Sequence, residues 1–255
     1  MPRIPTFKFH GSKCRIAKWI FGDMPNNLLV DSYYEPFAGR GNTFFYFASR
    51  FSFQSAHLND LYMAHFLRAL RDYSGTYDFV PQYIDRATYD RLYQHPNTQE
   101  RSLAESFCAY NGTFWGGGAN ITSSPTKPSK NKHSRTNTIK RFQEARRLLH
   151  GVEIHELDYV DFISRLSLNS SDLMYCDPPY LQSQKCKLKD MTIDHDKLAS
   201  ILVQLPCKVI LSGYQNAIYD TILTGWNVHE HQRASCGKNS NHTSNYVTER
   251  KWQNF

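Results

Sequence analysis

Six short apolar runs, rich in β-forming residues and bounded by residues that favour turns, recur along the chain. Several of them are separated by stretches with the apolar period of a helix, and Asp194 is placed to cap one of these helices. This alternation predicts an α/β fold with a doubly wound, mostly parallel sheet. The predicted strands are residues 32–36, 55–59, 152–157, 172–176, 208–212 and 226–231, and the predicted helices are 43–50, 161–166, 194–205 and 216–223.

The alternation is interrupted from about residue 61 to residue 150, which predicts an inserted, mainly helical region. Residues 122–138 contain no apolar side chain, so they cannot bury a face of their own, and we expect a mobile loop there. The helix expected over 139–149 places Phe142, Ala145 and Leu149 on one side. Residues 1–60 and 151–255 are expected to form the other, larger domain.

The net charge of +7 originates in the insertion. Residues 122–150 hold eight Lys and Arg side chains and one acid, Glu144, so this segment carries as large an excess as the whole chain. A concentrated basic segment is typical of proteins that bind an anionic partner such as nucleic acid.

Other features exclude several classes of protein. The chain has no run of 18 apolar residues, and its N-terminal segment lacks the apolar region of a signal peptide, so we expect no membrane association and no secretion. The cysteines are scattered, without a CxxC pair or a Cys/His cluster, which predicts reduced thiols and no metal site. They are Cys14, Cys108, Cys176, Cys186, Cys207 and Cys236.

A glycine-containing turn, EPFAGRGN over residues 35–42, directly follows the first predicted strand. Gly39 and Gly41 allow the backbone to approach a ligand closely, beside the N-terminus of the next helix. Phe44 stands where a dinucleotide fingerprint needs its third glycine, which disfavours a nicotinamide oxidoreductase. Asp60 ends the next strand and is placed to accept ribose hydroxyls. The alternative is a cap for the helix that begins near residue 61.

A second motif, Asp177-Pro178-Pro179-Tyr180, follows the strand predicted at 172–176. Proline fixes its own φ and lacks an amide donor, so this turn is stiff and presents carbonyl oxygens. A carboxylate, a rigid carbonyl and an aromatic face at one strand end are suited to gripping a flat ring that carries an amine. The alternative is a proline-stiffened loop end with a capping aspartate.

The FxGxG and DPPY motifs, in this order and with an insertion between them, resemble the Dam-like D12 class of DNA adenine-N6 methyltransferases of the α-group motif order. The resemblance runs nearly end to end. It includes FHGSK at 9–13, LDY at 157–159, LSGY at 211–214 and ERKWQNF at 249–255. It implies a Rossmann-like sheet that binds S-adenosylmethionine (AdoMet), with residues 61–150 as the target-recognition domain.

The resemblance implies transfer of a methyl group from AdoMet to N6 of adenine. Asp177 and the Pro178 carbonyl would accept the N–H bonds of the amine, Pro179 would stiffen the turn, and Tyr180 would stack on a flipped base. Amine methylation needs no cysteine nucleophile, so positioning and electrostatics are expected to supply most of the acceleration.

The same resemblance assigns residues to the cofactor. The residues expected on its methionine part and ribose are Phe37, Gly39, Gly41, Asp60 and Asp177. Asp158 is expected on its adenine amine, with Tyr159 beside the ring. Lys13 is expected to pair with the methionine carboxylate and Phe9 to line the methyl pocket. The alternatives are a solvated surface lysine and a plain core phenylalanine.

The insertion is expected to contact DNA. Tyr110-Asn111-Gly112 resembles the recognition segment of GATC-methylating enzymes, but Trp115 and three glycines follow where those enzymes place a guanine-reading arginine. We therefore expect a target other than strict GATC, with Trp115 as a wedge or stacking platform and Arg135 or Arg141 as a substitute guanine reader. The residues expected to bind DNA are Asn111, Trp115, Lys127, Lys130, Lys132, Arg135, Lys140 and Arg141.

The sequence thus predicts a stand-alone DNA adenine-N6 methyltransferase acting on double-stranded DNA, a monomer or weak dimer in the cytoplasm of a bacterium or phage-infected host. An RNA adenine-N6 methyltransferase would share the same pocket chemistry and remains open. A catalytically idle DNA-binding protein on the same scaffold is the third hypothesis, and the intact Asp177, Pro178 and Tyr180 argue against it.

Overall fold

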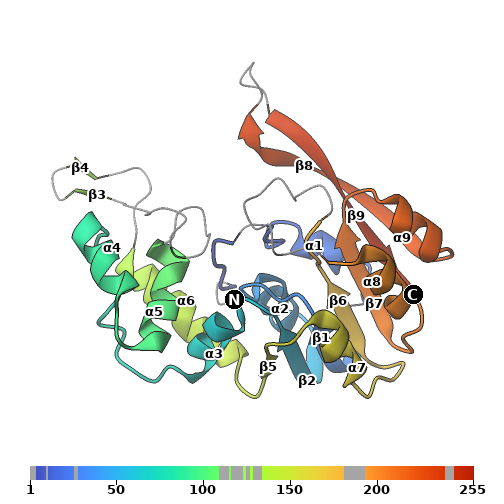
Figure 1. Cartoon of the computed structure of the whole chain (residues 1–255), viewed down its shortest axis with the longest axis horizontal. Coiled ribbons are helices and arrows are strands. Elements are labelled where there is room, and N and C mark those ends of the chain that lie inside the picture. The colour runs from blue at the N-terminus through green and yellow to red at the C-terminus, as the bar shows by residue number, and fades with distance from the viewer. Residues whose placement is uncertain are drawn as a thin grey trace.

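The computed structural model describes residues 4–9, 11–25, 28–108, 115, 123–124, 127–128, 134–180, 193–238 and 244–255, with the backbone alone at 123–124, 127–128, 234–238 and 244–245. Its main sheet has seven strands in the order β5-β2-β1-β6-β7-β9-β8 (Figure 1). The strands are β1 (Leu29–Glu35), β2 (Ser52–Asn59), β5 (Glu153–His155), β6 (Leu173–Cys176), β7 (Lys208–Gly213), β8 (Asn227–Lys238) and β9 (Ser244–Gln253).

The strand order reverses between β1 and β6, as expected of a doubly wound sheet. Strands β5, β2, β1, β6 and β7 pair in parallel, whereas β9 pairs antiparallel with both β7 and β8. The predicted Rossmann-like α/β fold is confirmed. In such folds, ligands bind beyond the carboxyl ends of the strands at the point of reversal.

Helices cover both faces of this sheet (Figure 1). Side chains of β6 alternate between the faces, so Leu173 and Tyr175 join one apolar cluster and Met174 and Cys176 join the other. The first cluster includes residues of α1 (Ala17–Ile20), α2 (Asn42–Ala48) and α3 (Ala64–Asp72). The second includes residues of α7 (Tyr159–Ser164), α8 (His195–Leu202) and α9 (Ala217–Ile222). The predicted Asp194 cap is confirmed, since its carboxylate accepts Lys197 N–H at 2.9 Å.

The insertion connects β2 with β5 and contains α3 and three further helices, α4 (Arg86–Tyr93), α5 (Thr98–Cys108) and α6 (Arg135–Leu148). Figure 1 shows α4, α5 and α6 beside the sheet, near the short strands β3 (Ser123–Ser124) and β4 (Lys127–Pro128). Phe142, Ala145 and Leu149 are buried, as the helical pattern predicted. They belong to the same apolar cluster as Tyr33 and Tyr175 of the sheet, so the insertion and the sheet share one core.

The start of α6 and the strands β3 and β4 lie within residues 122–138, where a mobile loop is expected, and the mobility itself stays a prediction. Helix α6 begins at Arg135, because Ser134 caps it by accepting Asn137 N–H at 3.3 Å. Thr138 in its first turn is buried, and its Oγ1 accepts a hydrogen bond from Arg141 at 2.9 Å. The backbones of β3 and β4 also pair as a short antiparallel ladder. The rest of the stretch lies outside the described residues.

The four cysteines in the described part of the chain are free thiols, as predicted. Cys108, Cys176 and Cys207 are buried, and Cys14 is half-buried. Strand β8 contains most of the strand predicted at 226–231 but continues to Lys238, and β9 begins at Ser244, before the ERKWQNF segment that resembles the family. Among the described residues, no helix combines the length and apolar character that a membrane span requires.

A buried ion pair joins the glycine-containing turn to the insertion. The Arg40 guanidinium lies 2.8 Å from a Glu105 carboxylate oxygen of α5, and it also donates to the Lys8 carbonyl at 2.8 Å. It lies between the rings of Phe9 and Phe66, at 5.5 and 5.2 Å from their centroids. Both charged side chains are almost fully buried, so each depends on the other for compensation.

We predict that Glu105→Ala lowers the free energy of unfolding by about 3–5 kcal/mol, because it leaves the Arg40 charge buried and uncompensated. The double variant Arg40→Met, Glu105→Met should recover most of this loss. Asp90→Ala, which breaks the exposed Arg86–Asp90 pair, is the matched control and should cost less than about 1 kcal/mol. Urea unfolding measures all three, and equal losses for Glu105→Ala and Asp90→Ala would contradict the prediction.

Candidate active site

Four segments of the predicted site follow neighbouring strands of the sheet. The EPFAGRGN turn begins at the end of β1, Asp60 follows β2, Asp177 follows β6, and the LSGY segment ends β7. Because these strands are adjacent and parallel, their carboxyl ends meet at one edge of the sheet. The residues that the sequence singled out at strand ends are therefore gathered at the point where the strand order reverses.

The glycine turn can be built only with glycine at two positions. Gly39 and Gly41 have φ values of 51° and 73°, in the left-handed region that disfavours other residues. A Cβ at Gly39 would lie 3.0 Å from the ring of Phe9, and one at Gly41 would lie 3.0 Å from Leu67. The two glycines therefore allow Phe9 and Leu67 to pack directly against the backbone of this turn.

Asn42 holds the N-terminal segment in place over this turn. Its side chain accepts Phe7 N–H at 2.8 Å and donates to the Phe7 carbonyl at 2.8 Å and to Ser12 Oγ at 2.9 Å. These bonds position the FHGSK segment, and with it Phe9 and Lys13. Sequence reasoning assigned no role to Asn42, although its place directly after the glycines marked it as the start of the helix.

Asp60 is occupied by backbone amides. Its Oδ2 accepts Gly39 N–H at 2.7 Å, and its Oδ1 accepts the N–H groups of Tyr62 and Met63 at 2.9 and 2.8 Å. Burial raises the pKa of this carboxyl, and the amide bonds oppose the rise. The contacts are those of the capping alternative, with an added tie to the glycine turn. The ribose role remains a prediction.

A second acid, Glu35, is almost fully buried nearby and was given no role by the sequence. The Tyr33 hydroxyl donates to it at 3.0 Å. Burial holds its pKa well above the usual range, and the neighbouring charges of Asp177 and Asp60 add to this effect. Glu35 therefore takes up a proton more readily than an exposed glutamate does.

The residues expected around the cofactor adenine lie beside the ends of β1 and β5. Asn59 links the two, because its amide donates to the Pro36 and Leu157 carbonyls, both at 3.0 Å, and its Oδ1 accepts Leu157 N–H at 3.0 Å. Asp158, which follows, is exposed and caps α7 through Val160 N–H at 2.8 Å. Asn59 is thus another positioning residue that sequence reasoning missed.

Phe37 and Tyr159 form an aromatic wall next to Asp158. Their ring centroids lie 5.4 Å apart with the planes tilted by 36°. The Tyr159 hydroxyl donates to the Asp194 carbonyl at 3.1 Å, and burial raises the pKa of Tyr159 to about 12. The hydroxyl thus stays protonated and the ring is fixed.

Three donors from different segments converge on one oxygen of Asp177. Its Oδ1 lies 3.0 Å from Lys13 Nζ, 3.0 Å from the Tyr180 hydroxyl and 3.2 Å from Ser212 Oγ. Among the described residues, none donates to Oδ2. Burial raises the pKa of the carboxyl, and the Lys13 ammonium opposes that rise. The arrangement fixes one oxygen and leaves the other for a ligand.

Lys13 is buried rather than solvated, so the surface-lysine alternative is wrong. Its ammonium donates to the Gly11 carbonyl at 2.8 Å and lies 4.5 Å from the centroid of the Tyr180 ring, in addition to its ion pair with Asp177. The sequence predicted the methionine carboxylate of the cofactor as its partner. The structure brings Lys13 to the DPPY turn, and its role toward the cofactor stays a prediction.

Glu249 of β9 is a site residue that the sequence did not single out. It is fully buried, and Arg233 of β8 donates to its Oε1 through Nε at 2.9 Å and a terminal nitrogen at 2.6 Å. The Tyr180 hydroxyl lies 3.1 Å from its Oε2. Tyr180 has one hydroxyl proton for two carboxylates, so Glu249 and Asp177 share it.

A cavity of about 250 Å³ opens next to the DPPY turn. The Tyr214 ring meets the Tyr180 ring edge-on at 4.7 Å, and these two rings form part of its wall. His195 and Tyr219 add a polar pair, with Nδ1 and the hydroxyl 2.5 Å apart. Gly213, Gln215, Asn216 and Ala217 complete the lining. The cavity is thus aromatic with polar groups, and its Tyr180 wall is bonded to Asp177.

Two residues expected to read DNA contact the protein itself. Arg135 donates to the Val80 carbonyl at 2.8 Å, and Arg141 donates to Thr138 Oγ1 at 2.9 Å. Both guanidinium groups therefore stabilise the fold of the insertion, a role that the sequence did not predict.

The other residues of the insertion that were expected to bind DNA differ in their exposure. Lys140 is exposed, and Trp115 is half-buried between Tyr89 and Tyr93, each 5.3 Å from it between ring centroids. Asn111, Lys130, Lys132 and the side chain of Lys127 lie outside the described residues.

The model of the D12 class of N6 adenine-specific DNA methyltransferases matches residues 9–234. The chain belongs to this family. The match includes the glycine turn, the insertion, the DPPY turn and the LSGY segment, and it confirms the predicted family and AdoMet as the cofactor. The protein is therefore an AdoMet-dependent methyltransferase of the adenine-specific D12 class.

Solved structures are similar to this methyltransferase only remotely. A conserved hypothetical protein from Streptococcus pyogenes is 11% identical, with a TM-score of 0.41 over 94% of this chain and 95% of the other. The N-terminal domain of human METTL16 is 9% identical, with a TM-score of 0.39 over 98% of this chain and 71% of the other. A sequence comparison with curated proteins finds no match.

We predict that Gly39→Ala weakens AdoMet binding and lowers stability by more than Gly151→Ala does. Both glycines have positive φ, so each variant should lose about 1–2 kcal/mol of unfolding free energy to backbone strain. Only the Cβ at position 39 also strikes Phe9, whereas the one at 151 meets open space. Equilibrium dialysis and urea unfolding test this, and equal losses with unchanged AdoMet affinity for both would refute it.

Proposed function

We propose that this methyltransferase transfers a methyl group from AdoMet to N6 of an adenine that is flipped out of double-stranded DNA. The observation that carries the proposal is the convergence of Lys13, Tyr180 and Ser212 on Asp177 Oδ1. A carboxylate held through one oxygen presents its other oxygen in a fixed direction at the carboxyl end of β6. This is the preorganised acceptor that an exocyclic amine requires.

The lone pair of the adenine amine is conjugated with the ring, so the nitrogen is a poor nucleophile. In our proposal, Asp177 Oδ2 and the Pro178 carbonyl accept its two N–H bonds, which favours a pyramidal nitrogen with its lone pair directed at the cofactor. AdoMet supplies an electrophilic methyl group when bound. Asp177 is also the nearest base for the proton that the methylated nitrogen must lose, and its raised pKa suits that task.

The residues around the glycine turn fit AdoMet. Gly39 and Gly41 hold the left-handed turn at the carboxyl end of β1, and we assign this turn, with Phe9 packed on it, to the methionine part of AdoMet. We assign Phe37 and Tyr159 to one face of the cofactor adenine and exposed Asp158 to its amine. Asp60, tied to Gly39, is assigned to the ribose.

Two further assignments concern residues next to Asp177. Lys13 bonds to Gly11 and to Asp177, and we assign its third N–H to the cofactor carboxylate. We assign the target adenine to the cavity walled by Tyr180 and Tyr214, with Pro179 keeping the turn rigid. Stacking on an aromatic ring is how enzymes hold a base that has left its duplex.

We assign the target sequence and polymer to the insertion, residues 61–150. Its basic charge favours a nucleic-acid backbone as its partner. The D12 class consists of DNA methyltransferases, which favours DNA over RNA. Trp115 packs on the rings of α4 and cannot form a bidentate contact to guanine, so we propose a target word other than strict GATC.

Methyl transfer from labelled AdoMet to equal amounts of duplex DNA, single-stranded DNA and RNA of one sequence tests this assignment. We expect duplex DNA to be methylated fastest and to compete most strongly. Sequencing of the modified adenines would then give the target word. Faster transfer to RNA would establish the alternative RNA activity, and transfer to none of the three would favour the idle DNA-binding hypothesis.

We predict that Asp177→Asn reduces the single-turnover rate by about 10² to 10³, by analogy with the loss of one charge-assisted contact in a preorganised site. The asparagine can still accept bonds at Oδ1, but its amide presents N–H donors to the N–H donors of the substrate. AdoMet affinity should remain within about threefold of the wild-type value. Asp196→Asn, at an exposed acid of α8, is the control. A rate within threefold of wild type would end the assignment.

We predict that Lys13→Met moves the acid limb of the pH–rate profile to higher pH. The carboxylate form of Asp177 is the active one, and removal of the ammonium raises the pKa of that carboxyl further. An adjacent opposite charge shifts a carboxyl by about one to three units, so the limb should move by at least one. Lys18→Met, at an exposed lysine of α1, should leave it unmoved. Single-turnover rates at saturating AdoMet measure the shift, and an unmoved limb in Lys13→Met would contradict it.

A further inference from the structure

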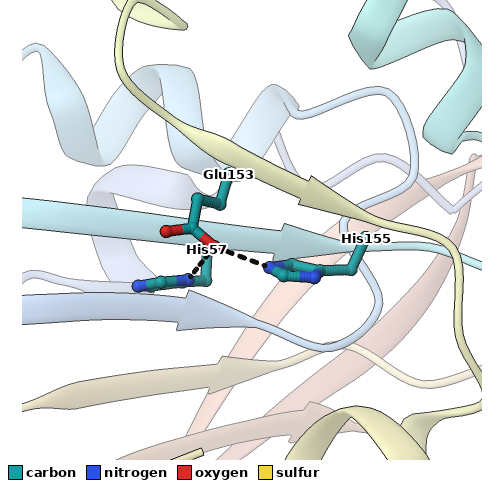
Figure 2. Close-up of side chains that lie close together, drawn as sticks. All are labelled: His57, Glu153 and His155. Atoms are coloured by element: carbon teal, nitrogen blue, oxygen red, sulfur yellow. Dashed lines mark ion pairs between the residues drawn. The ribbon is translucent and has the colours of Figure 1, made fainter.

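Three side chains that commonly bind metals meet on the sheet, and none of them belongs to the candidate active site (Figure 2). His57 comes from β2, and Glu153 and His155 come from the edge strand β5. His57 is directly opposite Glu153 in the parallel register, and His155 is two residues further along β5. Strand geometry places all three on one face, the face covered by α7.

Their spacing matches that of ligands around a single ion. His57 Nδ1 lies 3.4 Å and His155 Nε2 lies 3.6 Å from the same Glu153 oxygen, and the three ligand atoms lie within 4.8 Å of one another. Zinc binds nitrogen and oxygen at about 2.0–2.2 Å in a tetrahedron, so neighbouring ligands lie about 3.4 Å apart. A small movement of the two imidazole rings would place the three ligand atoms at three corners of this tetrahedron. The fourth corner would be open to a water ligand.

The surroundings orient both imidazoles. The His57 Nε2 lies 3.4 Å from Ser55 Oγ, which donates its own proton to Ser32 Oγ at 2.8 Å and so can accept one from the ring. This leaves Nδ1 with its lone pair toward Glu153. Metal-bound histidines usually have such a partner on their second nitrogen. The His57 ring is stacked between Tyr34, at 4.9 Å, and His155, at 5.8 Å.

An ordinary ion pair explains these contacts less well. Both distances to Glu153 exceed the 2.7–3.2 Å of a normal hydrogen bond. His155 Nε2 is buried and has no hydrogen-bond partner among the described residues. Within the same part of the chain, Glu153 pairs with no lysine or arginine, and the nearby Arg68 pairs with Glu156 at 2.6 Å instead. Neither imidazole is thus within normal hydrogen-bonding distance of the carboxylate that lies between them.

We propose that His57, Glu153 and His155 bind one Zn²⁺ ion, which fastens the short edge strand β5 to β2. Imidazole and carboxylate are a ligand set that this ion accepts. The ion would hold the end of β5, which leads within three residues to Asp158, the residue assigned to the amine of the cofactor adenine. The sequence predicted no metal site because the ligands come from distant strands and include no cysteine.

Titration of the EDTA-treated protein with Co²⁺, a coloured substitute for Zn²⁺, tests the proposal. The visible bands of Co²⁺ in a four-coordinate site should appear at one equivalent and be displaced by Zn²⁺. They should lack the near-ultraviolet charge-transfer band of a thiolate, which would indicate binding to cysteine. Glu153→Gln and His155→Gln should each weaken binding at least about tenfold, since even losing an outer partner of a ligand costs 10–100-fold.

His150→Gln removes an exposed histidine outside the cluster and is the matched control, with unchanged binding expected. Melting temperatures in EDTA check that each variant folds, and Zn²⁺ should raise that of the wild type but not of Glu153→Gln. Glu153 is exposed, so its substitution should leave the fold intact. Equal Co²⁺ affinity in wild type and Glu153→Gln, a thiolate spectrum, or no binding in the wild type would overturn the proposal.

Discussion

A carboxylate whose one oxygen receives three donors is the interaction on which this site depends. Lys13 arrives from the N-terminal segment, Tyr180 from the DPPY turn and Ser212 from β7, so Asp177 is correctly held only when all three segments are in place. The Tyr180 hydroxyl is itself held by a second contact, to buried Glu249 of strand β9. Segments far apart in the chain thus cooperate to fix one oxygen and free the other.

Contacts between distant segments also link the glycine turn to the insertion. Gly39 is tied to Asp60, and the neighbouring Arg40 forms a buried ion pair with Glu105 of α5. Helices of the insertion also share the apolar core of the sheet. In our account, a rigid connection of this kind lets the region that reads the nucleic acid hold a fixed distance from the region that binds AdoMet, so that a flipped base arrives with its amine near Asp177.

Much of the fold was predictable from the sequence, because local signals decide it. Apolar β-rich runs gave the parallel strands, and Asp194 marked a helix start where its cap is found. The chemistry-bearing turns were predictable for the same reason, since glycine and proline constrain the backbone locally. The start of α6 was predicted too late because the residues around it are polar. Ser134 caps the helix, and the first turn ends in buried Thr138 without an apolar residue.

The contacts between distant segments were not predictable. No local pattern reveals that Lys13 reaches Asp177, or that Arg135 supports Val80 rather than facing a phosphate. Glu249 likewise looked like a charged residue of a hairpin, and only the sheet order brings it to Tyr180. Long-range pairing of this kind depends on which strands become neighbours, and a single sequence carries little information about it.

The most direct test of this account is a crystal structure of the protein with a non-reactive AdoMet analogue and a duplex containing its target adenine. We expect the adenine to be flipped out, with N6 within hydrogen-bonding distance of Asp177 Oδ2 and the Pro178 carbonyl, while Lys13, Tyr180 and Ser212 remain on Oδ1. A target amine bound by other groups, or an Asp177 whose Oδ1 donors have left it for the substrate, would contradict the account.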